Sequence, residues 1–351
     1  MQRAARKPQN SDVIAKAPCR VDLAGGTVDI WPLYLFHPGA ITVNVAVDIQ
    51  TSCRITAARS AEIHLHSLDT GREDHFANFE ALAAARRPRH ELAAHLVRFF
   101  QPRGGFLLQT HSAAPAGAGI SGSSALMIAA TAALACYVGR RVTHEAIREI
   151  AQNVEAQLIG VPTGCQDYYP ALYGGVSALH LEPDGIHREE LAVPAAELER
   201  RVVLAYTGAP RQSGINNWEV FKAHIDGSRQ VRRNFERIVE IAQAMAAALR
   251  ARDWRDIERL LSEEWKLRKT NAPGISTPLI DRLIRIAGRH GGRAAKVCGA
   301  GGGGCVLFLV APGAGQRVAK ALIDGGGEIL PFRVAAKGLT LSKPAIVRAD
   351  A

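Results

Sequence analysis

The sequence predicts an α+β protein of two domains, covering residues 1–195 and 196–351. Three observations support this prediction. First, 351 residues, with 47% hydrophobic and 22% charged, are enough for two hydrophobic cores of ordinary size. Second, the first half combines alternating, strand-like segments with glycine-rich turns and an apolar, alanine-rich helix. Third, long amphipathic helices dominate the second half before it returns to short apolar strands.

Strand-like segments open the chain. Val13 to Leu23 reads as a strand that enters a turn at Gly25-Gly26. From Ile41 to Ile49, β-branched residues alternate with small or polar ones, and the pattern continues weakly to Ile55. This alternation predicts a half-buried strand.

A further strand is predicted around Ile63 and Leu65, which alternate with His64 and His66. Two histidines two residues apart on a strand can bind a metal ion. Because no third ligand lies nearby in the sequence, we expect an exposed strand face there instead.

The most informative stretch is the glycine-rich segment from Pro115 to Ala125. The short apolar segment Gly105 to Leu108 precedes it, and the almost entirely apolar segment Leu126 to Val138 follows. This order predicts a strand, a tight turn and a buried helix. The glycines would let backbone N–H groups approach a ligand, and the helix start adds unpaired donors and a positive dipole end. Together they predict an anion site, with phosphate as the usual occupant.

Two familiar phosphate-binding loops fit this segment poorly. A Walker loop needs Lys and then Ser or Thr after its second glycine, whereas Ser123 follows Gly122 and no lysine lies nearby. Gly117, Gly119 and Gly122 satisfy the G-x-G-x-x-G spacing of dinucleotide-binding loops. That motif needs an acidic residue about 20 positions later, where this chain has the basic segment Gly139-Arg140-Arg141. A tight turn without any ligand is the other alternative.

Helical periodicity continues on both sides of the predicted domain boundary. Thr143 is the expected N-cap of a helix that ends before Gly160. The other predicted elements are helix 91–100, strand 202–206, three amphipathic helices between Val231 and Ile286, strands 294–297 and 306–310 around a glycine run, helix 316–323 and strand 329–334. The apolar stripes of these helices are interpreted as core.

Composition argues against several functional classes. No run of about 18 apolar residues exists, so no membrane span is expected, and the polar, basic start is not typical of a signal peptide. Six scattered cysteines without a C-x-x-C pair indicate neither a zinc site nor a disulfide framework, and they fit a reducing cytoplasm. A net charge of +10 comes without a nucleic-acid-binding motif, so we attribute it to solvated faces and an anionic substrate.

Three glycine-rich segments lie far apart along the chain. Residues 17–26 read A-P-C-R-V-D-L-A-G-G, residues 115–125 read P-A-G-A-G-I-S-G-S-S-A, and residues 296–305 read K-V-C-G-A-G-G-G-G-C. In this order they resemble A-P-G-R-V-x-L-x-G, P-x-G-x-G-L-G-S-S-A and K-x-x-G-A-G-x-G-G. These are the three motifs of the GHMP kinases, the family of galactokinase, homoserine kinase, mevalonate kinase and phosphomevalonate kinase. The resemblance covers most of the chain.

Within this family, the chain looks most like sugar kinases of the D-glycero-D-manno-heptose 7-phosphate kinase type. Arg20 is followed nine positions later by Asp29, where such kinases carry an acid that binds sugar hydroxyls. Residues 164–169, G-C-Q-D-Y-Y, together with Gly174-Gly175, resemble their G-K-Q-D-Q-Y…G-G. Mevalonate kinases are one residue shorter between the glycine and the aspartate, so that branch fits less well.

The resemblance implies an ATP-dependent small-molecule kinase with Mg²⁺ as cofactor. The expected acceptor is a hydroxyl, preferentially the anomeric one, of a heptose-phosphate-like or galactose- or fucose-like sugar. The implied fold is an N-terminal ribosomal-S5-like α/β domain and a C-terminal ferredoxin-like domain, with ATP between them. Whether the chain forms a homodimer stays open. The alternatives are a kinase for a non-sugar alcohol such as mevalonate or homoserine, a non-catalytic sensor of sugar and ATP, and a dinucleotide oxidoreductase.

The same resemblance implies roles for individual residues. Asp167 would accept the proton of the substrate hydroxyl or hold the hydroxyl in line, and Arg20 would keep Asp167 ionised and stabilise charge on the transferred group. Ser123 and Glu155 would bind Mg²⁺. The expected nucleotide-binding residues are Pro115, Gly117, Gly119, Ser121, Gly122, Ser123 and Ser124. The expected substrate-binding residues are Gly26, Asp29, Arg211, Gly301 and Gly302.

The chain departs from the family pattern at four places, which involve six residues. Cys19 replaces a glycine, and Ser121-Gly122 stands where Gly-Ser is usual, which moves the flexible position of the loop by one residue. Thr27-Val28 replaces Gly-Thr, and Cys165 replaces lysine. The last two lie near the expected sugar pocket, so the identity of the sugar is left open.

Overall fold

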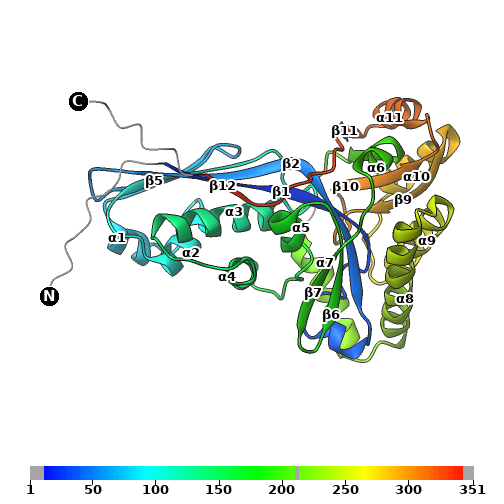
Figure 1. The fold of residues 1–351 in the computed structure, drawn as a ribbon, viewed down its shortest axis with the longest axis horizontal. Helices are drawn as coiled ribbons and strands as arrows, with labels where there is room; N and C mark the ends of the chain where they lie inside the picture. Colours follow the sequence, from blue (N-terminus) through cyan, green and yellow to red (C-terminus); the bar gives the residue numbers. More distant parts are fainter. Residues whose placement is uncertain (1–11, 210–212, 343–351) are drawn as a thin grey trace.

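In the computed structural model, which describes residues 12–209 and 213–342, the chain forms two β-sheets with helices packed against them (Figure 1). The larger sheet has eight strands, of which β3 and β5 pair in parallel. The smaller sheet has four strands, and all of its pairs are antiparallel. The mixed α+β class predicted from the sequence is confirmed. Within these described ranges, no helix combines the length and the apolar character needed to cross a membrane.

The eight-stranded sheet is built around β1 and β2. Its main order is β12-β1-β2-β5-β3-β4, while β6 pairs with the first part of β2 and β7 pairs with β6. The strands are β1 (Val13–Ala24), β2 (Ile41–Ala57), β3 (Ile63–Ser67), β4 (Arg72–Phe76), β5 (Phe106–Ser112), β6 (Val176–Glu182), β7 (Gly185–Glu190) and β12 (Thr340–Ser342). A short 3₁₀ helix, η1 (Leu33–Phe36), lies in the connection from β1 to β2. The first glycine motif therefore begins on a central strand.

The alternation predicted along β2 is present only in its second half. From Val47 to Ile55, buried positions alternate with more exposed ones. From Ile41 to Val47 every residue is buried, including the polar residues Thr42 and Asn44. Helix α8 (Arg229–Ala251), from the C-terminal half, packs against β1 and β2. This second covering layer explains why the first half of β2 is buried on both faces.

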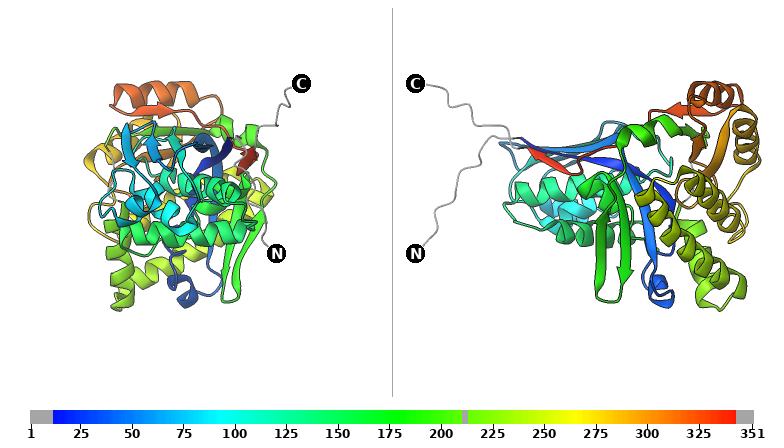
Figure 2. Two further views of the ribbon diagram at one scale, coloured as in Figure 1. Left: turned by 90° about the vertical axis from the view of Figure 1, so that its left-hand side faces the viewer. Right: turned by 45° about the vertical axis from the view of Figure 1, so that its right-hand side comes forward.

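Five helices lie together on one face of the large sheet (Figure 2). They are α1 (Phe79–Ala84), α2 (Glu91–Phe100), α3 (Gly122–Tyr137), α4 (His144–Ile159) and α5 (Tyr168–Tyr173). Helix α3 packs between β1 and β2 on one side and α2, α4 and α5 on the other. Its many alanines allow this close approach, and nearly all of its residues are buried. The predicted buried helix after the glycine turn is thus confirmed.

The smaller sheet has the order β11-β8-β10-β9. Its strands are β8 (Val202–Tyr206), β9 (Gly292–Val297), β10 (Cys305–Val310) and β11 (Glu328–Leu330), and the remaining helices are α6 (Ala195–Arg201), α7 (Ser213–Ile225), α9 (Trp254–Arg268), α10 (Pro278–His290) and α11 (Gly315–Asp324). The three predicted amphipathic helices are confirmed as α8, α9 and α10. The last strand predicted here is shorter than expected, because the chain leaves this sheet after Leu330.

The end of the described chain returns to the large sheet. Val334 forms a bridge with Val47, and β12 pairs with β1. Gly174 lies beneath this crossing, where a Cβ atom would come within 2.8 Å of backbone atoms of residues 335–338. The predicted boundary near residue 195 falls between β7 and β8, but residues 334–342 rejoin the first sheet. The two halves are therefore connected at more than one point.

Candidate active site

Arg20 and Asp167, which are 147 residues apart, form a direct ion pair. The Nε atom of Arg20 donates to Asp167 Oδ1 at 2.8 Å, and Nη2 donates to the same oxygen. The Nη1 atom donates to the carbonyl oxygen of Gly119 at 2.8 Å. Arg20 lies on β1 and is 1% exposed, whereas the side chain of Asp167, just before α5, is 22% exposed. One buried guanidinium thus contacts both the expected catalytic carboxylate and the glycine loop.

Two nearby carboxylates, of Asp22 and Asp167, keep this arginine charged. Burial alone would lower the pKa of Arg20, but the nearby Asp167 and Asp22 outweigh it and raise that pKa. Burial would likewise raise the pKa of Asp22, but the cations of Lys296 and Arg20 hold it well below its usual range. Arg20 and Asp22 therefore stay ionised at neutral pH, although both are buried.

The glycine loop turns sharply and then enters α3. Gly117 and Gly119 have φ values of 69° and 77°, which are accessible mainly to glycine. Ser121 has φ 62° and ψ 31°, and no side chain caps the N-terminus of α3. The first backbone N–H groups of this helix therefore lack a side-chain acceptor, which is the arrangement that binds phosphate.

This loop forms one wall of a cleft of about 510 Å³. Residues from Pro115 to Ser124 contribute to that wall, together with Glu155 and Asp167. The turn between β3 and β4, from Ser67 to Arg72, lies on the border of the same cleft. All seven residues expected to bind the nucleotide line it.

Ser123 and Glu155 are hydrogen-bonded to each other within this cleft. Ser123 Oγ donates to Glu155 Oε1 at 2.7 Å, and the hydroxyl of Tyr168 donates to Glu155 Oε2 at 2.6 Å. Burial raises the pKa of Glu155, although these hydrogen bonds oppose the shift. A carboxylate and a hydroxyl beside a phosphate-binding loop are the hard oxygen ligands that suit Mg²⁺. The donor set therefore fits the expected metal.

Asp29 lies directly behind the segment that carries Asp167. Its Oδ2 accepts a hydrogen bond from the backbone N–H of Gln166 at 2.9 Å. Gly164 is required here, because a Cβ atom would lie 2.1 Å from the same oxygen. Asp29 is 2% exposed, and burial raises its pKa to about 6. It does not line the cleft itself.

The other expected substrate-binding residues are placed differently. Gly26 lies next to this region, where a Cβ atom would approach the Gln166 amide to 2.7 Å. Gly301 packs against Ile275, whose carbonyl oxygen accepts a hydrogen bond from the N–H of Gly302 at 2.8 Å. Arg211 lies outside the described residues. Contact of these residues with a substrate stays a prediction.

The third glycine motif packs against the central loop. The N–H of Cys305 donates to the carbonyl oxygen of Ala118 at 2.7 Å. A Cβ atom on Gly304 would lie 2.6 Å from that same oxygen. This close approach explains the glycine at position 304 and places the third motif directly against the central loop.

Four charged residues that had no predicted role connect the first motif to the C-terminal half. Lys296 Nζ forms a buried ion pair with Asp22, and Asp22 Oδ1 accepts from the N–H of Gly299 at 3.0 Å. Lys296 also lies 3.8 Å from Glu264. Arg268 pairs with Glu264 and donates from Nη2 to the carbonyl oxygen of Gly26 at 2.9 Å.

The sequence pointed to two of these four residues but not to the other two. Asp22 and Lys296 lie inside the quoted motifs, so their positions, but not their pairing, were visible in the sequence. Glu264 and Arg268 are four residues apart on α9, a spacing typical of an ordinary exposed helix pair. Only their burial distinguishes them from such a pair.

Two family models match separate parts of this chain, and known proteins match nearly its whole length. The GHMP kinases N terminal domain model matches residues 84–175, and the GHMP kinases C terminal model matches residues 245–327. D-glycero-alpha-D-manno-heptose 7-phosphate kinase of Campylobacter jejuni is 25% identical over 92% of this chain and 97% of that protein. Mevalonate kinase of Pyrococcus horikoshii is 24% identical over 94% of this chain and 98% of that protein.

The fold is shared with solved structures of the same kind. A D-glycero-D-manno-heptose 1-phosphate kinase from Bacteroides thetaiotaomicron superposes with a TM-score of 0.76 at 22% identity. That match covers 95% of this chain and 99% of the other. The overall fold of this chain is thus the fold of that structure.

Proposed function

This chain belongs to the GHMP kinase family, and from that premise we propose that it transfers the γ-phosphoryl group of ATP to a hydroxyl of a sugar or sugar phosphate. The observation that carries the proposal is that Asp167 and the central glycine loop line one cleft and that the buried Arg20 contacts both. Phosphoryl transfer needs bound phosphates, neutralised charge and an aligned hydroxyl. In the cleft, the glycine loop would bind the phosphates, Ser123 and Glu155 would hold the neutralising cation, and Asp167 would align the hydroxyl.

Phosphate binding falls to the central loop and the start of α3. Their backbone N–H groups would hold the phosphates of ATP, helped by the positive end of the helix. Ser123 and Glu155 would hold Mg²⁺, which, when bound, neutralises charge on the transferring phosphoryl group. Tyr168 fixes the second oxygen of Glu155, so one carboxylate oxygen stays oriented toward Ser123.

Asp167 would accept the proton of the attacking hydroxyl, or hold that hydroxyl in line with the phosphorus. Arg20 donates two of its N–H groups to one oxygen of Asp167, which leaves the other oxygen available to the substrate. The positive charge of Arg20 also lies close to the glycine loop, where negative charge develops during transfer.

The acceptor pocket would lie beside Gly26 and Asp29. The ionised carboxylate of Asp29 would accept hydrogen bonds from sugar hydroxyls, and Arg268 would support the Gly26 carbonyl that borders this pocket. The similarity to a heptose 7-phosphate kinase favours a heptose-phosphate-like acceptor. Arg211 stays the predicted partner of a substrate phosphate.

A substrate panel with coupled detection of ADP tests this proposal. We expect ADP formation with MgATP and a heptose 7-phosphate or another sugar, and none with mevalonate or homoserine. ADP formation only with a non-sugar alcohol would move the chain to another branch of the family. Binding of ATP without ADP formation from any acceptor would contradict catalysis and favour a sensor.

A further inference from the structure

The hairpin of β3 and β4 brings together three histidines and a glutamate that do not line the nucleotide cleft. In its antiparallel register, His64 lies opposite His75 and His66 lies opposite Glu73. Residues two apart on a strand share one face, so the four side chains form a two-by-two group. Ile63 and Leu65, which alternate with the two histidines of β3, are buried in the hydrophobic core. The group therefore lies on the face of the hairpin turned away from the core.

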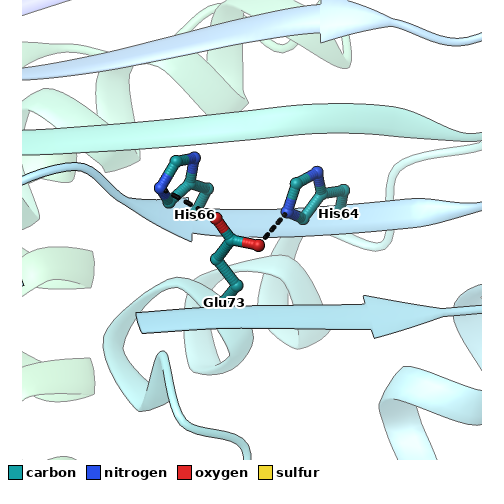
Figure 3. Close-up of side chains that lie close together, drawn as sticks. All are labelled: His64, His66 and Glu73. Atoms are coloured by element: carbon teal, nitrogen blue, oxygen red, sulfur yellow. Dashed lines mark ion pairs between the residues drawn. The ribbon is translucent and has the colours of Figure 1, made fainter. Parts of the chain in front are cut away.

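The donor atoms of this group converge on the Glu73 carboxylate (Figure 3). His66 Nε2 lies 3.1 Å from Glu73 Oε1, and His64 Nε2 lies 3.6 Å from Glu73 Oε2. One ligand atom from each of His64, His66 and Glu73 lies within 4.8 Å of the others. Around a tetrahedral zinc ion with bonds of about 2.0–2.1 Å, neighbouring donors are about 3.3 Å apart. Small side-chain rotations would bring all three donors to that spacing.

Of the three histidines in this group, only His66 lies within hydrogen-bond distance of the Glu73 carboxylate. The Nε2 atom of His64 is buried and has no hydrogen-bond partner among the described residues. Its 3.6 Å separation from Glu73 is too long for a hydrogen bond. A buried polar atom without a partner is unfavourable. A cation between the imidazoles and the carboxylate would give His64 Nε2 a partner and would also contact His66 Nε2 and Glu73.

We propose that His64, His66 and Glu73 bind one zinc ion, with water as the fourth ligand. Two imidazole nitrogens and a carboxylate oxygen form a donor set that zinc favours, whereas Mg²⁺ prefers oxygen ligands alone. The site is therefore distinct in chemistry from the Ser123–Glu155 pair. His75 stacks on His64 with ring centroids 3.8 Å apart, so it covers one side of the His64 ring.

The position of the site gives it a structural consequence. Strand β4 lies at the edge of the sheet, and all of its side chains are partly or fully exposed. An ion held by β3 and β4 together would attach this edge strand firmly to its neighbour. The turn between the two strands borders the nucleotide cleft, so the same ion would make that border more rigid.

Zinc binding to the full chain, stripped with EDTA and dialysed into buffer containing Mg²⁺, tests the proposal. We expect one zinc ion per chain by equilibrium dialysis and a higher Tm with zinc than without it. The variants His64→Ala and Glu73→Gln should each bind zinc at least about tenfold more weakly, and they should lose the rise in Tm. Thermal unfolding without zinc reports whether these variants are folded.

His187→Ala is the matched control. His187 lies on β7, where its exposed Nε2 is 3.0 Å from Asp184 Oδ1. His180 lies opposite it on β6 but pairs with Glu189, and in the described part of the chain these donors do not converge as those of His64, His66 and Glu73 do. This variant should bind zinc as the parent protein does. Absence of stoichiometric zinc in the parent protein, or equal zinc affinity in the parent, His64→Ala and Glu73→Gln, would overturn the proposal.

Discussion

Arg20 links two groups that must act together during phosphoryl transfer. Its guanidinium is buried, so its contacts with Asp167 and with Gly119 have little competition from water. Asp167 is partly exposed toward the cleft and would otherwise be free to rotate. The arginine therefore orients the expected catalytic carboxylate relative to the loop expected to hold the nucleotide.

Replacing Asp167 with asparagine tests this arrangement. Asparagine keeps the shape and can still accept hydrogen bonds from Arg20, but it cannot take up the hydroxyl proton. We expect kcat to fall at least about a hundredfold, with little change in Tm. Asp69→Asn, a change of another cleft-lining carboxylate, should leave kcat nearly unchanged. An unchanged rate in Asp167→Asn would remove the assignment of the base.

Asp29 gives a prediction about pH. Burial raises its pKa to about 6 from the ordinary value of 3.8. Between these two pH values the folded protein holds a proton that the unfolded chain releases, so the stability contributed by this group falls as pH rises. Asp29→Asn should therefore be roughly 2–3 kcal/mol more stable than the parent protein at pH 7, and similar to it near pH 4.

Denaturant unfolding at both pH values measures this difference. Asp48→Asn, at an exposed position of β2, controls for the change in net charge and should show no such dependence. A stability difference that stays constant from pH 4 to pH 7 would show that Asp29 does not titrate as described. The same Asp29→Asn variant should raise KM for the acceptor, since it loses a charged hydrogen-bond acceptor.

At the scale of single elements, the junction between the glycine loop and α3 carries a local conflict. Ser121 adopts a left-handed conformation at the position before the helix, while Gly122 occupies the first helical position. A left-handed backbone is costly for any residue with a Cβ atom. A Cβ atom on Gly122 would lie 3.1 Å from Ala114 Cβ, so that position is crowded. Relative to the usual Gly-Ser order, the Ser-Gly order of this chain therefore has two effects. It places a Cβ atom at the left-handed position 121, which is unfavourable, and it keeps a Cβ atom out of the crowded position 122, which is favourable.

Ser121→Gly should relieve the unfavourable backbone conformation. We expect a gain of about 0.5–1 kcal/mol in the free energy of unfolding, because the left-handed cost exceeds the extra entropy of glycine in the unfolded chain. Gln101→Gly, at the left-handed C-cap of α2, is a matched control and should give a similar gain. Destabilisation by Ser121→Gly, measured by denaturant unfolding, would show that the serine hydroxyl contributes more than the backbone costs.

At the scale of the whole molecule, buried charges connect the two halves. Asp22 from β1, Lys296 from β9, and Glu264 and Arg268 from α9 form one group with Arg20, and all five are buried. Their attraction is strong in an environment without water, but each charge depends on the presence of the others. The group therefore fixes the position of the first motif relative to the third.

Lys296→Met should show this dependence. Methionine has a similar length but no charge, so Asp22 and Glu264 would lose a buried cation. We expect destabilisation of about 3 kcal/mol in denaturant unfolding. Arg237→Met, which removes exposed ion pairs with Glu240 and Glu263 on the surface of α8 and α9, should cost less than about 1 kcal/mol. Equal effects of the two changes would contradict a special role for the buried group.

Residues close together in sequence were predicted well, and residues that meet only in space were not. The histidines at 64 and 66 illustrate the difference. Their exposed face was predicted from alternation, but Glu73 and His75 come from the next strand, and only the hairpin register brings them opposite. Likewise, alternation along β2 could not reveal that α8 covers its first half.

The sequence by itself determined where this protein forms its turns and helices, and its three glycine motifs were enough to indicate the family. Glycine spacing, helical periodicity and capping residues are local properties, so the turns, the buried α3 and the amphipathic helices could be recognised without coordinates. Only the tertiary structure decided which charges meet, such as Lys296 with Asp22, and which segments return, such as β12 beside β1. The physical reason is that burial and pairing depend on packing between distant segments, which no local pattern encodes.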